Sequence, residues 1–323
     1  MRSLKRLLPA TIIATVALCL VALAAMAEDK PARIVVSHVT APFNVPSIVM
    51  QRTGLLDKAF AAEGIKVELP EITSGAKQVQ ALAAGSLDIA SVLGGTSAII
   101  GRANGAEIVI VAAYSRSPEA FFVMSLAKGP ATIESLKGKS VAGPKGTTLN
   151  QLLAAALASQ RMTLADVNYI NMDLPAARAA LLAGKVDAAT LAGNHALAVE
   201  AAGGKAIASG KGLIEPTAVV AVRKAFLDKH PAQVERFLAA HRDAVAFVAK
   251  NRGEALKLAA AEQKITLADA ERMIGWYDFA PVMTDADIAN LDADQDFMIE
   301  SKMIERRIDI RKDLVHPMAF KTR

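Results

Sequence analysis

The sequence predicts an α/β protein built from two lobes of similar plan. Strand-like and helix-like segments alternate along most of the chain, which is typical of α/β sheets rather than of sandwiches or helical bundles. A helix–glycine–strand stretch occurs twice, at residues 79–95 and 178–194. The chain has 323 residues, 53% of them hydrophobic, which is enough for two lobes of ordinary domain size.

A first round of alternating elements covers residues 33–114. Apolar and β-branched runs predict strands at residues 33–37, 65–72, 87–92 and 107–114. Helices that end at glycines are expected at residues 45–53, 55–63 and 76–84.

The second half of the chain repeats this rhythm and then becomes helical. Strands are expected at residues 140–142, 167–172, 186–191 and 217–223, and helices at residues 148–161, 176–183, 231–251, 269–276 and 285–304. The last three helices follow without a linker and fit a wrap on the first lobe. We therefore expect residues 28–116 and 224–323 to form lobe 1, and residues 117–223 to form lobe 2.

The two rounds also share sequence. VQALAAGSLDIASVLGG (residues 79–95) aligns without gaps on RAALLAGKVDAATLAGN (residues 178–194), with seven identities in 17 positions. Both contain G-x-x-D-x-A. Two independent helix–glycine–strand turns are the alternative, because glycine is common after helices. The shared aspartate favours a paired architecture.

The N-terminus has the features of a secretory signal peptide covering residues 1–27. Three basic residues precede an apolar run at residues 11–25, which ends in the small–x–small pattern Ala25-Met26-Ala27. A retained membrane anchor is the alternative. Cys19, the only cysteine, lies in this segment, so the mature chain is expected to contain no disulfide, thiolate nucleophile or cysteine-based metal site. We expect a periplasmic protein.

The charge balance argues against a nucleic-acid partner. Lys and Arg number 37 against 32 Asp and Glu, and three of the basic residues lie within residues 1–27, so the rest carries 34 − 32, or +2. No basic stripe is interleaved with aromatic residues. A later segment with the length and apolarity of a membrane span is also missing.

Signals of catalysis are weak. The five histidines form no HExxH pattern, and no G-x-S-x-G elbow, P-loop or G-x-G-x-x-G is present. We expect no catalytic residue, no metal site and no cofactor.

Small and polar residues follow most predicted strands and begin the next helix. The candidates are Asn44, Ser74, Gly95, Thr96, Thr147, Thr148, Asn194 and His195. In open α/β sheets ligands bind beyond the carboxyl ends of the strands, where helix beginnings offer free N–H groups to anions. Plain helix capping explains any single loop equally well. Their recurrence in both lobes, with few acidic residues, predicts a shared cleft for a neutral or anionic small molecule.

Several further residues have two interpretations each. Lys145 either complements an anion or is a solvated surface lysine. Tyr114 and Ser115 lie where the chain first crosses between the lobes, although Tyr114 also suits the core. Trp276 and Tyr277, in the one aromatic cluster, either close over a ligand or bury apolar area.

Four stretches carry a resemblance to a known family, and the likeness as a whole extends over nearly the whole mature chain. They are GLLDKAFAAEGIKVELPEITSGAKQVQALAAGSLDIASV (residues 54–92), IESLKGKSVAGPKGTTLNQLL (residues 133–153), AALLAGKVDAATLAG (residues 179–193) and FLDKHPAQVERFLAAHRDAVAFVAKN (residues 226–251). The chain resembles the periplasmic substrate-binding proteins of ABC importers, in particular the nitrate/sulfonate/taurine family related to thiamine-pyrimidine-precursor binders.

This resemblance implies a two-lobed type II periplasmic binding protein fold, with crossing hinge strands and a helical C-terminal wrap. It also implies a receptor that traps a small molecule by hinge closure and delivers it to a membrane permease driven by an ATPase. We expect a monomer. The ligand-contacting loops of the family correspond here to Phe43, Asn44, Gly95, Thr96, Tyr114, Ser115, Thr147, Thr148, Asn194 and His195, and Ser74 joins them through the capping argument.

The ligand stays open among sulfonate, nitrate, carboxylate and pyrimidine-like molecules. Many sulfonate binders carry a tryptophan-rich segment followed by Asp-Pro where this chain has LAGNHAL (residues 191–197). The alternative function is a pyrimidine-precursor synthase-like enzyme of the same fold. Such enzymes use a cysteine-rich segment, which the expected mature chain lacks. Two further alternatives fit the sequence less well. The effector domain of a transcription regulator needs an N-terminal helix-turn-helix, where this chain has its expected signal peptide. The extracellular sensor of a signalling protein needs a later membrane span, which this sequence lacks.

Overall fold

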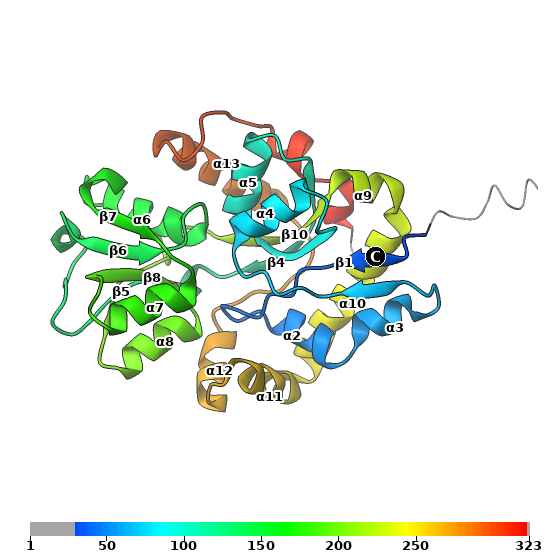
Figure 1. Cartoon of the computed structure of the whole chain (residues 1–323), viewed down its shortest axis with the longest axis horizontal. Helices are drawn as coiled ribbons and strands as arrows, with labels where there is room; N and C mark the ends of the chain where they lie inside the picture. The colour runs from blue at the N-terminus through cyan, green and yellow to red at the C-terminus, as the bar shows by residue number, and fades with distance from the viewer. Residues whose placement is uncertain (1–29, 322–323) are drawn as a thin grey trace, which may run out of the picture.

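The computed structural model describes residues 30–321. The expected signal peptide and Cys19 lie outside this range. Figure 1 shows two bodies side by side, which we call lobe 1 and lobe 2. Lobe 1 contains β1–β4, β10 and the C-terminal helices, and lobe 2 contains β5–β9 with α6–α8.

Lobe 1 is built on five strands. Strand β1 (Arg33–Val35) pairs in parallel with β2 (Lys66–Glu68), and β10 (Thr217–Arg223) lies antiparallel between β3 (Ile89–Gly94) and β4 (Ile108–Arg116). A parallel bridge between Val36 and Ile89 joins the two groups into the order β2-β1-β3-β10-β4. The helices of this part of the chain are α2 (Val45–Arg52), α3 (Leu55–Ala61), α4 (Gly75–Ala83) and α5 (Gly95–Ala103).

Lobe 2 has one five-stranded sheet in the order β7-β6-β8-β5-β9. Its strands are β5 (Phe121–Ser125), β6 (Ser140–Gly143), β7 (Asn168–Asn171), β8 (Ala188–Ala192) and β9 (Lys205–Ser209). Strands β6, β7 and β8 are parallel, whereas β5 is antiparallel to both of its neighbours. The helices are α6 (Thr148–Ala158), α7 (Leu174–Leu182) and α8 (Asn194–Ala201).

The two sheets follow the same plan, as the sequence repeat predicted. In each sheet the fourth strand in the order, β10 or β5, is the antiparallel one. The repeat itself forms α4–β3 in lobe 1 and α7–β8 in lobe 2, with Gly85 and Gly184 at positive φ after the helices. The shared spacing places Asp88 and Asp187 alike, since each carboxylate accepts a hydrogen bond from a backbone N–H of the adjacent strand region, Val35 at 3.0 Å and Ser140 at 2.8 Å. These two aspartates therefore fasten β1 in lobe 1 and β6 in lobe 2.

Several elements differ from the sequence prediction. Strands β5 and β9 and helix α11 (Arg252–Gln263) were not expected, and β2 covers only three residues of the predicted strand at 65–72. Strand β9 lies at the edge of its sheet and begins with two exposed residues, so it lacks the apolar run that identifies a buried strand. Strand β10, inside the segment predicted as lobe 2, pairs with the lobe 1 strands β3 and β4. The lobe boundaries themselves stay a prediction.

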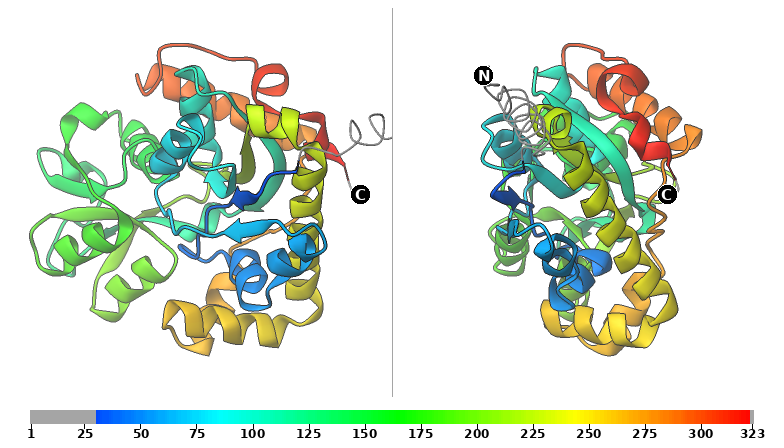
Figure 2. Two further views of the ribbon diagram at one scale, coloured as in Figure 1. Left: turned by 45° about the vertical axis from the view of Figure 1, so that its right-hand side comes forward. Right: turned by 90° about the vertical axis from the view of Figure 1, so that its right-hand side faces the viewer.

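The C-terminal helices cover lobe 1. They are α9 (Lys224–Lys229), α10 (Pro231–Lys250), α11, α12 (Leu267–Ile274) and α13 (Asp285–Glu300). Helix α10 packs against α2 and α3, and α13 packs against α5. Figure 2 shows α10 along the side of lobe 1 that faces away from lobe 2. Within residues 30–321, no helix has both the length and the apolarity needed to cross a membrane.

The core of lobe 1 contains a buried histidine. His241 of α10 is fully buried and stacks on Tyr114, with ring centroids 5.4 Å apart. Burial lowers the pKa of His241 to about 4. The charge of Arg242 also lowers this pKa, whereas the backbone of Ala113 raises it. The imidazole is therefore neutral in the folded protein at neutral pH.

We predict that His241 makes the protein sensitive to acid. The unfolded chain binds a proton at a pKa near 6.5, so the contribution of this group to stability is full above that pH and is lost as the pH falls towards 4. The loss amounts to about 3 kcal/mol, because each pKa unit corresponds to about 1.4 kcal/mol. Urea unfolding of wild type and His241→Phe at pH 7 and pH 4 should show a smaller acid-induced loss in the variant. Equal losses in both proteins would contradict this prediction.

Candidate functional site

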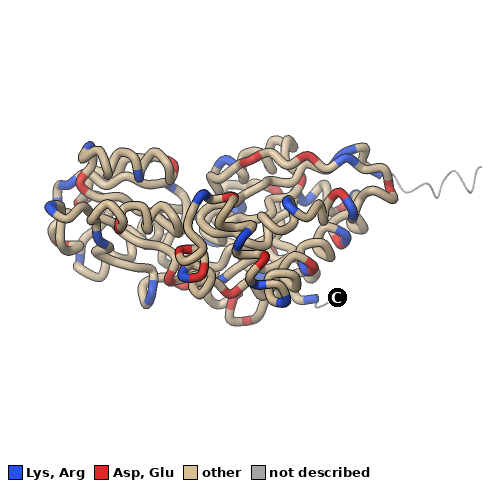
Figure 3. Tube along the Cα trace, turned by 90° about the horizontal axis from the view of Figure 1, so that it is seen from below, with Lys and Arg blue, Asp and Glu red and all other residues tan. Residues whose placement is uncertain are grey.

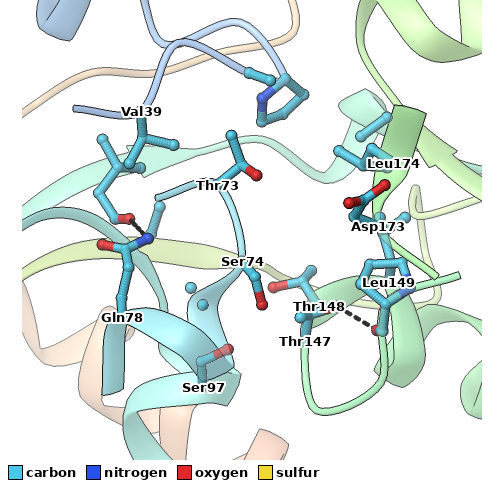
Figure 4. A pocket seen from close by; sticks show the side chains of 18 of the residues that line it. Val39, Thr73, Ser74, Gln78, Ser97, Thr147, Thr148, Leu149, Asp173 and Leu174 are labelled. Atoms are coloured by element: carbon cyan, nitrogen blue, oxygen red, sulfur yellow. Dashed lines mark hydrogen bonds between the residues drawn. The ribbon is translucent and has the colours of Figure 1, made fainter. Parts of the chain in front are cut away.

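A pocket of about 650 Å³ lies between the two lobes. Figure 4 shows its walls, with Thr73, Ser74 and Ser97 from lobe 1 on one side, and Thr147, Thr148, Asp173 and Leu174 from lobe 2 on the other. Strands β3 and β8 end at this pocket, at Gly94 and Ala192. The pocket therefore lies beyond the carboxyl ends of strands from both sheets, where the sequence placed the shared cleft.

Helix α4 begins at the lobe 1 wall. Its N-cap residue Ser74 accepts a hydrogen bond from the Lys77 N–H at 3.5 Å, and Gly75, Ala76 and Lys77 line the pocket. The first N–H groups of a helix have no acceptor within the helix. A Cβ on Gly75 would lie 2.4 Å from Ser97 Oγ and 3.0 Å from Ser97 Cβ, so the glycine lets α4 and α5 pack closely here. The close packing brings the N–H groups at the beginning of α4 to the pocket surface.

Helix α6 begins at the lobe 2 wall. The hydroxyl of its N-cap residue Thr147 donates to the Pro144 carbonyl at 2.8 Å and makes no cap hydrogen bond to the helix. The N–H groups of the first turn are thus left without a side-chain cap, and Thr148 and Leu149 line the pocket. Gly94 allows the close approach of Thr148, because a Cβ there would lie 3.1 Å from its Oγ1.

The loop before α6 is held rigidly. The Lys145 N–H donates to Asn171 Oδ1 at 3.0 Å, and the Gly146 N–H donates to Asn150 Oδ1 at 3.1 Å. Ser97 Oγ of lobe 1 donates to the Gly146 carbonyl at 2.9 Å and so links this loop to the opposite wall. Lys145 lines the pocket, and its ammonium lies 5.6 Å from the centre of the Tyr169 ring. Lys145 therefore lines the cleft, and its role in complementing an anion stays a prediction.

Helix α7 differs from α4 and α6 because a carboxylate caps its beginning. The Asp173 carboxylate accepts from the Ala176 N–H at 3.0 Å and caps the helix. A carboxylate at this position neutralises the positive end of the helix dipole. The charged side chains lining the pocket are Lys77, Lys145, Glu71 and Asp173. Of the three helix beginnings, those of α4 and α6 therefore suit an anion better than that of α7.

His195 lies in the first turn of α8 and also lines the pocket. Burial lowers its pKa to about 4. The positive charge of Arg178 also lowers this pKa, and the negative charge of Asp173 raises it. The ring is therefore neutral at pH 7. It can meet a ligand as a hydrogen-bonding group but not as a cation.

Several predicted site residues line this pocket, namely Asn44, Ser74, Ser115, Thr147, Thr148 and His195. Asn44 is buried, and its amide donates to the Ala41 carbonyl at 2.8 Å. Ser115 is buried near the end of β4, where the chain leaves for lobe 2. The structure thus brings residues from both rounds of the sequence to one cavity.

The other predicted residues do not line it, namely Phe43, Gly95, Thr96, Tyr114 and Asn194. Phe43 and Tyr114 are fully buried in the lobe 1 core, where the Tyr114 hydroxyl lies 3.1 Å from Ser47 Oγ. A Cβ at Gly95 would lie 2.5 Å from Leu291, and Thr96 donates to Gln151 at 2.8 Å. The buried Oδ1 of Asn194 has no hydrogen-bond partner within the described residues.

The pocket also contains residues that the sequence analysis did not select. They include Thr73, Lys77, Gln78, Ser97, Ser117, Phe121 and Asn171. Lys77 lies in the same helix-opening segment as Ser74, so the sequence could have indicated it as a site residue. Phe121 could not be predicted in this way, because β5 was not expected. Of the aromatic pair, Tyr277 lines the pocket and stacks on Phe279 with centroids 5.4 Å apart, whereas Trp276 packs edge-on against Phe122 of lobe 2 at 5.6 Å.

Solved structures of low sequence identity share this fold. The alkanesulfonate-binding protein of Xanthomonas axonopodis pv. citri, solved with bound MOPS, superposes with a TM-score of 0.78 and 21% identity, over 89% of this chain and 99% of that one. This likeness shows a periplasmic binding protein fold, as predicted.

Sequence relatives are named as binding proteins. A candidate aliphatic sulfonate-binding protein of Escherichia coli is 26% identical over 81% of this chain and 83% of its own length. A second one, from Bacillus subtilis, is 28% identical over 84% of this chain and 82% of its own length. The NMT1/THI5-like family matches residues 59–255, more than half of the chain and the part that contains most of the pocket loops. On this match, the chain belongs to the NMT1/THI5-like family.

Proposed function

We propose that this protein is the extracytoplasmic solute-binding receptor of an ABC importer and that it captures a small organic sulfonate between its lobes. One observation carries the proposal: the beginnings of α4 and α6 face one cavity from opposite lobes. Free N–H groups and the positive ends of helix dipoles favour an anion. A ligand held by both lobes favours the closed arrangement, since it gains contacts there that the open form lacks.

Sulfonate is favoured over the other anions by the names of the relatives. Both sequence relatives above are named as binding aliphatic sulfonates, and the structural neighbour as binding alkanesulfonates. The cavity suits such a molecule, because hydroxyl and N–H groups lie beside apolar side chains such as Val39, Leu174 and Phe121. A head with three oxygens would meet the helix beginnings, and an organic chain would meet the apolar part.

The remaining expectations belong to the same proposal. The receptor acts without catalysis, as a monomer in the periplasm, and delivers its ligand to a permease and its ATPase. Figure 3 shows basic and acidic residues interspersed over both lobes, which fits a partner other than nucleic acid. The enzyme alternative has less support, because the relatives are named as binding proteins.

The proposal is tested by the ligands that the protein binds. Thermal-shift and calorimetric titrations would compare butanesulfonate, taurine, pentanoate, nitrate and a pyrimidine. We expect a sulfonate to bind more tightly than the carboxylate of similar length, and scattering to show a smaller radius of gyration with the ligand. Binding of the carboxylate or the pyrimidine but of no sulfonate would refute the sulfonate assignment.

We predict that Thr148→Ala weakens sulfonate binding by about tenfold and leaves the melting temperature nearly unchanged. The reason is that a hydrogen bond to a charged group contributes about 1.5 kcal/mol or more. Thr266→Ala is the matched control. Thr266 caps α12 outside the pocket by accepting from the Asp269 N–H at 3.0 Å, so its loss should lower stability by about 1 kcal/mol without changing affinity. Wild-type affinity in Thr148→Ala would remove this residue from the site.

A further inference from the structure

A buried hydrogen-bonded chain connects the lobes behind the pocket. Gln151 of α6, in lobe 2, accepts from the Thr96 hydroxyl of α5 at 2.8 Å. The amide of the same side chain donates to the Asp294 carboxylate of α13 at 2.5 Å. All three residues are at least nine-tenths buried. One lobe 2 side chain is thus held between two lobe 1 helices, and we call this contact the interlobe clasp.

The clasp lies next to the proposed ligand site. Thr148, which lines the pocket, is three residues before Gln151, so both belong to the first turns of α6. Thr96 follows Gly94 and Gly95 at the beginning of α5, where a Cβ on Gly95 would touch Leu291 of α13. Movement of α6 away from lobe 1 would break both hydrogen bonds and admit water to Asp294. The clasp therefore belongs to the arrangement in which the lobes are together.

Asp294 has few groups to stabilise a negative charge. Its partner is one neutral amide, the neighbour Thr96 is neutral, and the charged group that acts on it from a neighbouring element is Glu215, in the loop before β10. No cation of the described residues is among the groups that shift its pKa. Burial without a cation penalises an ionised carboxylate, and a nearby negative charge increases this penalty.

Asp287, two turns earlier on α13, shows the opposite situation. It is also buried, which by itself would raise its pKa, but it accepts two hydrogen bonds from Arg116 and two from Thr284, and these hold its pKa below the ordinary value. Burial raises the pKa of Asp294 to about 7. The hydrogen bond from Gln151 lowers this pKa, and the negative charge of Glu215 raises it. The two carboxyl groups therefore differ in pKa because their hydrogen-bonding and charged partners differ, not because of where they lie on the helix.

We propose that the interlobe clasp is proton-sensitive: a protonated Asp294 favours the closed arrangement of the lobes, and its ionisation favours opening. Because opening exposes this carboxyl to water, closure takes up a proton. Closure should therefore become easier as the pH falls through 7 and should stop changing only well below pH 4, where the carboxyl is protonated in both arrangements. The idea rests on the proposed function and deepens it by adding a regulation of capture.

The test can be made without any ligand. The sole tryptophan, Trp276, packs against Phe122 across the lobes, and Arg272 beside it pairs with Glu200 of lobe 2 at 2.9 Å. Tryptophan fluorescence and the radius of gyration therefore both report closure. We expect the closed-to-open ratio of the free wild-type protein to rise about tenfold between pH 8 and pH 6. His195 does not contribute to this range, because its pKa is about 4.

The decisive variant is Asp294→Asn, which keeps the shape and an acceptor for Gln151 but cannot ionise. It should be as closed at pH 8 as wild type is at pH 6, with no dependence on pH. Asp296→Asn, an exposed change on the same helix, is the matched control and should behave like wild type. Carbon-13 NMR of aspartate carboxyls gives a direct second readout, in which the resonance missing from Asp294→Asn should titrate near pH 7.

Two results would overturn the proposal: pH-dependent closure in Asp294→Asn that equals wild type, or an Asp294 resonance that titrates near pH 4. Neither depends on the identity of the ligand. Failure of every sulfonate to bind would refute the proposed function and leave the clasp standing, and failure of the clasp would leave sulfonate capture standing.

Discussion

Replacing Gly193 by alanine is expected to reduce ligand affinity by about 100-fold. Gly193 lies between β8 and α8 with φ +54° and ψ −131°, a conformation open to glycine alone. A Cβ there would lie 2.6 Å from the Pro42 carbonyl oxygen of lobe 1. Since Gly193 belongs to lobe 2, the clash arises only when the lobes approach. Overpacking costs about 3 kcal/mol, which corresponds to the stated factor.

Gly184 provides the matched control for this experiment. It also has positive φ, at +65°, but a Cβ added there would have no other atom within 4 Å. Gly184→Ala should therefore lower the melting temperature through backbone strain and leave affinity unchanged. Calorimetric titration with the sulfonate that binds wild type, together with thermal unfolding, separates the two effects. Equal affinities for Gly193→Ala and Gly184→Ala would show that the contact between Gly193 and Pro42 plays no part in capture.

Replacing Asp287 by alanine is expected to lower the free energy of unfolding by about 3 kcal/mol. The Asp287 carboxylate is buried and receives Arg116 Nε at 2.6 Å and Nη2 at 2.5 Å, together with the Thr284 N–H at 2.7 Å. Arg116 ends β4, the strand from which the chain passes into lobe 2. Loss of the carboxylate leaves a half-buried guanidinium without its main partner and removes the capping box of α13.

Asp285 is the control for this prediction, since it lies in the same turn of α13 and pairs with Arg311 at the surface. Its side chain is 89% exposed, so Asp285→Ala should change stability very little. Urea unfolding at pH 7 distinguishes the two variants. Similar losses for both would mean that the Arg116–Asp287 pair contributes no more than an ordinary surface charge.

The sequence alone determined the alternation of elements and the paired plan of the lobes, because both depend on local patterns. Glycines at positive φ end α4 and α7, and apolar runs mark β3 and β8; these signals act within a few residues. The repeated aspartate could be recognised in the sequence, but its role is not local, because Asp88 binds Val35, 53 residues away, and Asp187 binds Ser140, 47 residues away. The family resemblance rests on the same stretches, and the family match confirms it.

Only the tertiary structure decided which helix beginnings face the pocket. Ser74 and Thr96 both lie at the beginning of a helix, yet Ser74 lines the cavity and Thr96 is buried in the clasp, because α13 packs over the beginning of α5. Likewise, Ser115 reaches the pocket and its neighbour Tyr114 enters the core, because successive residues of a strand point to opposite faces. Which face is covered depends on helices more than a hundred residues away in the chain. A local sequence pattern cannot predict such long-range packing.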